Sequence, residues 1–294
     1  MNRVSPKVLA LLATLTLMWG TNWPMFRIVL DEIPPWTFRV CTMASGALTL
    51  GAILVARGDS FAIPKGRWLA LIAAAATNIA IWNVATTLAV LYIPSGHASV
   101  LAYTMPLWVA VLGFAFLRQR LTHRMVAAIV IGAVAVVALM LPNFGTYASA
   151  PLGLFWGLAA GFAWAVGTLI VKRTSWPGMG LSLTFWQVVL SIPVIVSGAL
   201  LLEPMPPRWP STGVVLLTIY IGAVPMALGT SMWFALVKLL PAQVAALSSI
   251  AIPIVAIVSG VLILHEPLSP LQTLAIGSTV ISLWLALVPP RSVG

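Results

Sequence analysis

Long apolar runs dominate this chain, and short polar stretches separate them. No Asp, Glu, Lys or Arg occurs in residues 68–117 or in residues 125–171. Because an α-helix needs about 20 apolar residues to cross the hydrocarbon of a bilayer, each of these two runs is long enough for two spans. The other predicted spans are 8–26, 40–56, 174–202, 209–237, 239–264 and 267–290. The pattern therefore predicts ten membrane-spanning helices.

The runs are continuously apolar and not alternating, which favours an all-α polytopic membrane protein over a β-barrel. The first run follows Arg3 and Lys7 and so has the outline of a signal peptide. No small-x-small cleavage site follows it, and the run continues through Trp19 and Asn22. We therefore expect this segment to be the first span and not a cleaved leader.

The chain also matches itself at an offset of 147 residues. Proline and glycine matches are the evidence for this repeat, because apolar matches mean little in so apolar a sequence. The matched pairs are Gly20-Thr21 with Gly167-Thr168, Thr37-Phe38 with Thr184-Phe185, Gly51-Ala52 with Gly198-Ala199, Pro94 with Pro241, Pro106 with Pro253 and Gly113 with Gly260. The repeat predicts two five-helix units, residues 1–147 and 148–294, and the odd number of spans places them in opposite orientations. An inverted repeat around a midplane site is an architecture of transporters.

The distribution of charge predicts the orientation. Charged residues make up 7% of the chain and hydrophobic residues 61%, at a mean hydropathy of +1.07, whereas soluble domains are roughly 25% charged. With the N-terminus inside, only Arg27 and Arg208 of the 15 basic residues fall in outside segments. This positive-inside pattern predicts that both termini lie in the cytoplasm. It accounts for the net charge of +10 without a nucleic-acid partner.

Several kinds of chemistry lack their residues. The single cysteine, Cys41, cannot form an internal disulfide or a cysteine metal cluster. No G-x-x-x-x-G-K-[ST] motif occurs, so we expect no ATP-driven cycle in this chain, and we also expect no metal and no cofactor. The five acidic residues fall in loops or at span ends. Since proton-coupled cation exporters usually need a buried carboxylate, this favours facilitated diffusion, or weak coupling through another group, over cation/proton antiport.

Ten spans, Trp19-Gly20 in the first span and a Pro-x11-Pro pattern at 94–106 and 241–253 are features of a known group. By them the chain resembles the drug/metabolite transporter superfamily, and within it the EamA-type exporters. The resemblance implies a bacterial inner-membrane protein that exports small metabolites. Glu266 matches the acidic residue that follows the ninth span in that group, whereas Gln119 stands where the first repeat usually has Glu. The tryptophan-rich spans are similar to those of the YddG-type exporters of aromatic amino acids.

Polar and aromatic side chains in mid-span are the candidate substrate site, because buried polar groups are costly unless they are paired or face water. For each of them, helix–helix hydrogen bonding or plain packing is the alternative. A cavity of deep tryptophans with a few polar points suits a neutral or aromatic ligand. The candidates are Trp19, Asn22, Trp82, Asn83, Tyr103, Trp108, Trp164, Trp186, Gln187, Trp233, Ser248 and Ser249.

Pro106 and Pro253 are the candidate hinges, since they fall at equivalent mid-span places in the two repeats. A proline inside a helix removes one hydrogen bond and pushes on the carbonyl four residues back, here that of Ala102 or Ser249. We expect kinked helices whose freed carbonyls take a substrate amine, with a static, proline-shaped bundle as the alternative. Two GxxxG steps at 153–161 predict close packing within the bundle.

Arg39, His97 and Lys238 are candidates for gating or coupling. Arg39 enters the second span from the outside, where it either snorkels to the interface or binds a carboxylate at the outer mouth. His97 either titrates as a gate or is an ordinary hydrogen-bonded side chain. Lys238 also fits a positive-inside anchor.

These features predict a transporter that exports small neutral or zwitterionic metabolites by alternating access around a central apolar cavity. Amino acids, aromatic ones included, are the first expectation for the substrate. We expect a monomer in the bilayer, with a small-molecule substrate and no ATPase subunit. The alternatives are a multidrug or other-metabolite exporter, a membrane-embedded lipid enzyme, and a passive structural subunit. An enzyme is not expected, because no nucleophile–base pair is evident in the sequence.

Overall fold

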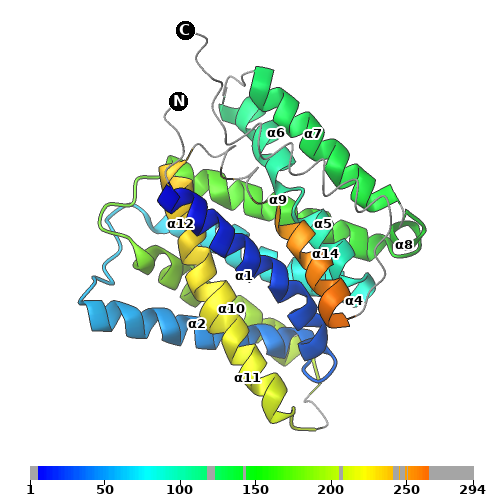
Figure 1. The fold of residues 1–294 in the computed structure, drawn as a ribbon. Helices are drawn as coiled ribbons and strands as arrows, with labels where there is room; N and C mark the ends of the chain where they lie inside the picture. Colours follow the sequence, from blue (N-terminus) through cyan, green and yellow to red (C-terminus); the bar gives the residue numbers. More distant parts are fainter. Residues whose placement is uncertain are drawn as a thin grey trace.

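The computed structural model describes residues 6–117, 123–141, 144–204, 208–240, 245, 249 and 251–264, and the regular elements in this part of the chain are all helical (Figure 1). In the first half these are α1 (Pro6–Leu30), α2 (Pro35–Arg57), α3 (Trp68–Ala74), η1 (Ala75–Ile81), α4 (Trp82–Tyr92), α5 (Ser95–Ala102), α6 (Met105–Leu117) and α7 (His123–Met140). In the second half they are α8 (Phe144–Ser149), α9 (Pro151–Arg173), α10 (Leu181–Leu202), α11 (Thr212–Ile221), η3 (Gly222–Gly229), α12 (Thr230–Leu239) and α14 (Ala251–Leu264).

Six helical stretches of the described residues are long and apolar enough to cross a membrane. They are Pro35–Arg57, Trp68–Tyr92, Ser95–Phe116, Pro151–Arg173, Leu181–Leu202 and Thr212–Leu239. The predicted all-helical class is thereby confirmed for the described part of the chain. The predicted number of ten spans stays a prediction, since the last of them, 267–290, lies outside the described residues.

Two π-helical segments interrupt the long helices, and the sequence analysis did not predict them. η1 begins at Ala75 and η3 begins at Gly222, which is 147 residues further along the chain. A π-helix closes its hydrogen bonds one residue later than an α-helix and is often found at functional sites. The irregularity thus recurs at the same place in the two predicted repeats.

The packing follows the same offset. α2 packs against η3, and the segments 147 residues away from these two, α10 and η1, also pack against each other. In the same way α1 packs against α14, while α9 packs against α6. Figure 1 shows α1, α14 and the yellow α11–α12 segment crossing the front of the bundle together. This arrangement supports two repeats, while their boundary at residue 147 and their opposite orientations in a membrane remain predictions.

Glycines let α9 lie close to its neighbours. A Cβ at Gly153 would lie 2.7 Å from the side chain of Ile93, and one at Gly157 would lie 2.6 Å from that of Leu101. A Cβ at Gly161 would lie 2.7 Å from the carbonyl oxygen of Ala102. The predicted role of the GxxxG steps in packing within the bundle is therefore confirmed.

Two carboxylates tie helix N-termini at one end of the bundle. Glu203, which follows α10, accepts hydrogen bonds from the backbone N–H groups of Trp36 at 2.6 Å and Thr37 at 2.9 Å, in the first turn of α2. Glu32, between α1 and α2, accepts hydrogen bonds from the backbone N–H of Ser211 at 2.6 Å and from its hydroxyl at 2.9 Å, next to α11. Each contact joins residues more than 160 positions apart, so the two halves are held together here.

We expect Glu203→Gln to loosen this end of the bundle. The carboxylate satisfies two unpaired N–H groups and lies at the positive end of the α2 dipole, and together these effects are worth about 1–2 kcal/mol. The thermal midpoint in detergent should then fall by roughly 2–8 °C. Asp31→Asn is the control, because Asp31 forms only an exposed pair with Arg27 at 3.5 Å. Equal midpoints for the two variants would contradict the capping role.

Candidate functional site

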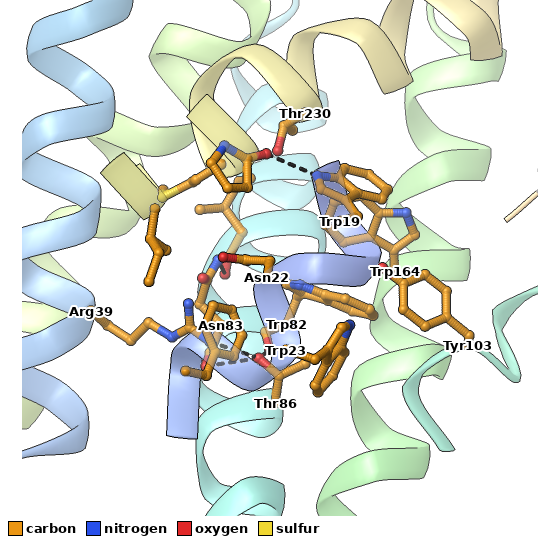
Figure 2. Close-up of a pocket in the computed structure, with 15 residues that line it drawn as sticks. Trp19, Asn22, Trp23, Arg39, Trp82, Asn83, Thr86, Tyr103, Trp164 and Thr230 are labelled. Atoms are coloured by element: carbon orange, nitrogen blue, oxygen red, sulfur yellow. Dashed lines mark hydrogen bonds between the residues drawn. The ribbon is translucent and has the colours of Figure 1, made fainter. Parts of the chain in front are cut away.

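A cavity of about 50 Å³ lies between helices of both halves (Figure 2). α1, α2, η1 and α4 line it from the first half, and α9, α11, η3 and α12 line it from the second. Its lining residues are Trp19, Asn22, Trp23, Phe26, Arg39, Ile79, Trp82, Asn83, Thr86, Tyr103, Trp164, Ile221, Pro225, Met226 and Thr230. The cavity thus lies where a movement of one half against the other would change it.

Helical spacing explains which side chains of α1 and α4 reach the cavity. Trp19, Asn22, Trp23 and Phe26 follow the i, i+3, i+4, i+7 pattern of one helix face. The η1–α4 segment repeats the pattern with residues 79, 82, 83 and 86. Sequence reasoning named Trp19 and Asn22 but omitted Trp23 and Phe26, which the same spacing indicates.

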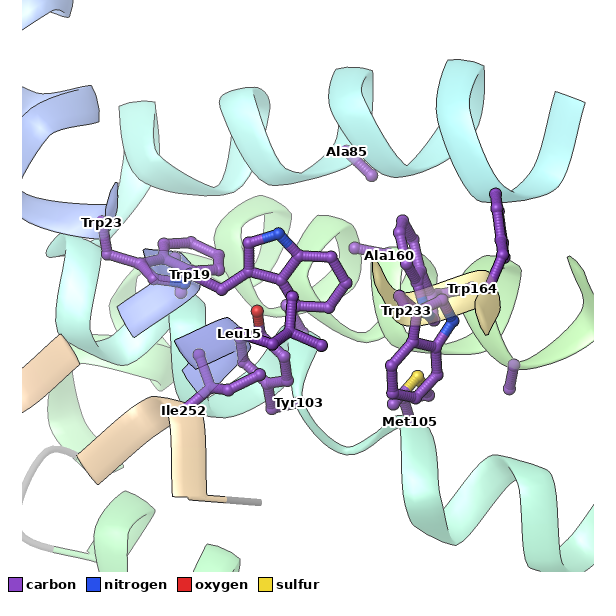
Figure 3. Close-up of a cluster of buried hydrophobic side chains, with 14 of the residues drawn as sticks. Leu15, Trp19, Trp23, Ala85, Tyr103, Met105, Ala160, Trp164, Trp233 and Ile252 are labelled. Atoms are coloured by element: carbon purple, nitrogen blue, oxygen red, sulfur yellow. The ribbon is translucent and has the colours of Figure 1, made fainter. Parts of the chain in front are cut away.

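Tryptophans from α1, α4 and α9 build an aromatic wall. The ring centroids of Trp82 and Trp164 lie 4.6 Å apart, and those of Trp19 and Trp164 lie 5.5 Å apart. Tyr103, in the turn after α5, adds edge contacts at 6.1 Å to Trp23 and at 6.0 Å to Trp82. Figure 3 shows Trp19, Trp164 and Tyr103 within the buried cluster of the bundle. These rings offer flat apolar surface to a ligand.

A hydrogen bond attaches this wall to the π-helical segment of the other half. The indole N–H of Trp19 donates to the carbonyl oxygen of Pro225 in η3 at 2.8 Å. A Cβ at Gly229 would lie 2.5 Å from that indole nitrogen, so the glycine leaves room for the ring. α1 and η3 are therefore linked directly at the cavity.

The opposite wall is polar and centres on Arg39 of α2, as Figure 2 shows with Asn22, Asn83 and Thr86 beside it. Nε of Arg39 donates to the hydroxyl oxygen of Thr87 at 2.5 Å, and Nη2 donates to that of Thr86 at 3.1 Å. The guanidinium carbon lies 4.3 Å from the ring centroid of Phe26. Among the described residues no carboxylate pairs with this cation.

Two consecutive threonines are arranged to receive the guanidinium. The hydroxyl of Thr86 donates to the carbonyl of Trp82, and that of Thr87 donates to the carbonyl of Asn83, both at 2.8 Å. Because each hydroxyl proton is used within α4, the oxygen lone pairs remain for Arg39. The interpretation that Arg39 snorkels to the interface is therefore wrong. Its side chain is 3% exposed and turns inward, because α4 supplies acceptors at that depth.

Several predicted site residues lie elsewhere in the structure. Trp233 is fully buried and packs behind the wall. Its ring centroid lies 5.9 Å from that of Trp19 and 6.2 Å from that of Trp164. Trp108 of α6 packs its ring on Phe162 at 5.4 Å and does not line the cavity.

Two further candidates of α10 also point away from the cavity. The indole N–H of Trp186 donates to the carbonyl of Phe61, between α2 and α3, at 2.8 Å. Gln187 is fully buried and accepts a hydrogen bond from Asn78 at 3.2 Å. Both therefore make the helix contacts that sequence reasoning kept as the alternative.

The carbonyls four residues before Pro106 and Pro253 do not face the cavity either. Pro106 is the second residue of α6, where its missing N–H costs nothing, so the helix breaks at the turn after α5 and does not kink. The Ala102 carbonyl faces Gly161, and the Ser249 carbonyl accepts the N–H of Ile252 at 3.0 Å. The expectation that these carbonyls take a substrate amine is wrong. A hinge role of Pro106 and Pro253 stays a prediction.

The remaining candidates lie away from the cavity or outside the described residues. His97 is half-buried in the first turn of α5, and Ser249 is buried before α14. Lys238 donates to the carbonyl of Met179 at 2.8 Å, next to a separate cavity of about 350 Å³. Three residues named in the sequence analysis, Ser248, Gln119 and Glu266, lie outside the described residues.

The cavity is small in this conformation. At about 50 Å³ it has room for a few water molecules, whereas pockets for organic ligands are typically about 300–1,000 Å³. A substrate can therefore enter only after the helices around it part.

The family of the chain follows from its sequence matches. The pattern of the EamA-like transporter family matches residues 6–141 and again residues 151–288. The chain belongs to this family. It is thus a multi-pass membrane protein, in agreement with the apolar helices.

Relatives of the EamA-like chain are transporters by name. It is 27% identical over 264 residues to the uncharacterized transporter YvbV of Bacillus subtilis (strain 168), a match that covers 88% of this chain and 84% of the relative. It is 25% identical to a probable amino-acid metabolite efflux pump of Escherichia coli (strain K12), covering 91% and 89% of the two chains. A solved crystal structure shares the fold, with a TM-score of 0.77 and 19% identity over 97% of each chain. The family and these relatives point away from an enzyme.

Proposed function

We propose that this EamA-like protein exports small zwitterionic or neutral metabolites, first of all amino acids, aromatic ones included. The observation that carries the proposal is the two-sided cavity between the halves, with a polar wall around Arg39 and an aromatic wall around Trp164. An amino acid has the same division into a charged head group and a side chain. The printed name of the Escherichia coli relative, a probable amino-acid metabolite efflux pump, supports the same class.

The charge of the cavity disfavours organic cations, and with them cation-selective multidrug export. Arg39 is positive, and no Asp or Glu occurs among the lining residues that the structure describes. A cationic substrate would meet an uncompensated like charge in a medium of low dielectric constant. Zwitterions and neutral molecules avoid this cost.

The proposed mechanism is alternating access. The two repeats, residues 1–147 and 148–294 in opposite orientations, part on one side of the membrane at a time and expose the cavity to that side. The cavity of the present conformation is small and must widen in this cycle before a substrate fits. We further propose that the protein works as a monomer in the inner membrane with both termini in the cytoplasm, driven by the outward gradient of its substrate and without an ATPase subunit.

Flux of labelled phenylalanine, tryptophan and threonine in proteoliposomes tests this function. With the pure protein and no ion gradient, we expect saturable flux that unlabelled amino acids compete away. Liposomes without protein give the background. Flux that appears only when a proton gradient is imposed would contradict facilitated diffusion. The absence of saturable flux under both conditions would contradict amino-acid transport itself.

A further inference from the structure

The polar wall of the cavity holds a positive charge and an unpaired hydrogen-bond acceptor. Arg39 is 3% exposed and lacks a carboxylate partner within the described part of the chain. The Oδ1 atom of Asn22 is buried and accepts no hydrogen bond from the described residues. Both side chains line the same cavity, and Figure 2 shows them on the side that faces the tryptophans. An unbalanced positive charge and an unsatisfied hydrogen-bond acceptor therefore line the same cavity.

Neither requirement is fully met by the protein. Two threonine oxygens and the rings of Phe26 and Phe38 hold the guanidinium, but neutral groups do not cancel its charge. Among the described residues, Nη1 of Arg39 has no acceptor. An ionisable side chain at membrane depth marks a functional site by default, because burying it without a partner is costly.

The hydrogen-bonding chemistry of the two groups indicates the ligand. A guanidinium offers parallel N–H donors that match the two oxygens of a carboxylate. An amide oxygen to which no protein group donates a hydrogen bond suits an ammonium group, which has three N–H donors and no acceptor. An α-amino acid carries these two groups on one carbon atom. The aromatic wall opposite is left for its side chain.

Resting on the proposed amino-acid transport, we propose that Arg39 and Asn22 form the head-group site for the substrate. The guanidinium of Arg39 binds the α-carboxylate, and Oδ1 of Asn22 accepts a hydrogen bond from the α-ammonium. Thr86 and Thr87 position the guanidinium from α4. A free carboxylate is therefore required for the transport of amino acids, whereas the aromatic wall selects among their side chains.

Analogues of phenylalanine test the site in the wild-type protein, without any mutation. Phenylalaninamide lacks the carboxylate, and 3-phenylpropionate lacks the ammonium. In counterflow of labelled phenylalanine, we expect 3-phenylpropionate to compete more weakly than phenylalanine, and phenylalaninamide to compete at least about tenfold more weakly still. Equal competition by phenylalaninamide and phenylalanine would overturn the head-group site and leave amino-acid transport standing. No saturable phenylalanine flux at all would instead overturn the function on which the site rests.

Variants assign the two contacts. Arg39→Gln keeps a donor for the threonines but loses the charge, so the KM for phenylalanine should rise at least about tenfold and phenylalaninamide should compete as well as phenylalanine. Asn22→Ala should raise the KM for phenylalanine and leave inhibition by 3-phenylpropionate unchanged. Arg27→Gln is the control, since Arg27 is exposed and pairs with Asp31. A purely structural Arg39 would lower the amount of folded protein and leave the analogue ranking intact, which would overturn its role.

If Arg39→Gln does not fold, the analogue series and Asn22→Ala decide the proposal. An Asn22→Ala protein that treats phenylalanine and 3-phenylpropionate as the wild type does would overturn the ammonium contact. A wild-type ranking in which phenylalaninamide equals 3-phenylpropionate would overturn the requirement for a carboxylate.

Discussion

Replacing Gly222 with alanine should clearly destabilise the bundle. Gly222 begins η3 and lies against α2, where an added Cβ would collide with the hydroxyl of Ser45 and the carbonyl oxygen of Thr42. A Cβ at Gly46 would in turn lie 3.0 Å from the carbonyl oxygen of Gly222. The Ser45 side chain can rotate aside, but the carbonyl group of Thr42 belongs to the backbone of α2 and cannot. Overpacking of this kind typically costs about 1–3 kcal/mol or more.

The thermal midpoint of purified protein in detergent measures this effect. For a Gly222→Ala variant we expect a fall of roughly 2–12 °C, and for Gly222→Leu a loss of the monodisperse peak in size-exclusion chromatography. Gly213→Ala is the matched control, because Gly213 lies in the adjacent α11 and an added Cβ there meets nothing within 4 Å. A wild-type midpoint for Gly222→Ala would show that α2 and η3 are not in close contact. Arg39 and Pro225 lie on these two elements, so the contact also sets the width of the cavity.

Apolar runs and prolines in the sequence predicted most of the helices, because both act locally. Uncharged runs coincide with the described spans, and Pro94 lies between α4 and α5. The π-helical segments could not be predicted, since no residue type requires them and they arise from packing between helices. The position of Pro106 was known, but whether the helix kinks or breaks there depends on the turn before it.

The cavity was predictable on α1 and α4 and not on η3. The α-helical spacing places the other lining residues of α1 and α4 on the same faces as Trp19 and Trp82. The lining residues 221, 225, 226 and 230 instead follow π-helical turns and do not keep this spacing. Arg39 remained ambiguous because its direction depends on two threonine hydroxyls on another helix. The candidates Trp108 and Trp186 were misplaced for the same reason, since depth in a span does not give rotation about its axis.

Truncating Trp164 should impair the transport of aromatic amino acids more than that of threonine. Its ring contacts Trp82, Trp19 and Trp233, so it is the centre of the aromatic wall. An aromatic side chain of the substrate gains about 0.5–1.5 kcal/mol from each ring it contacts, beyond the area buried. Trp164→Ala should therefore raise the KM for phenylalanine and tryptophan about three- to tenfold, with a smaller change for threonine, in proteoliposome flux normalised to folded protein.

Trp108→Ala separates loss of a substrate contact from loss of stability. Trp108 is also a deep tryptophan that packs against α9, through Phe162, but it does not line the cavity. Both truncations remove a large packed ring and so cost folding free energy, about 3–5 kcal/mol when the ring is fully buried. Only Trp164→Ala should alter the ratio of the KM values for phenylalanine and threonine. An unchanged ratio would mean that the aromatic wall supports the fold without contacting the substrate, and selection among side chains would then lie with groups other than Trp164.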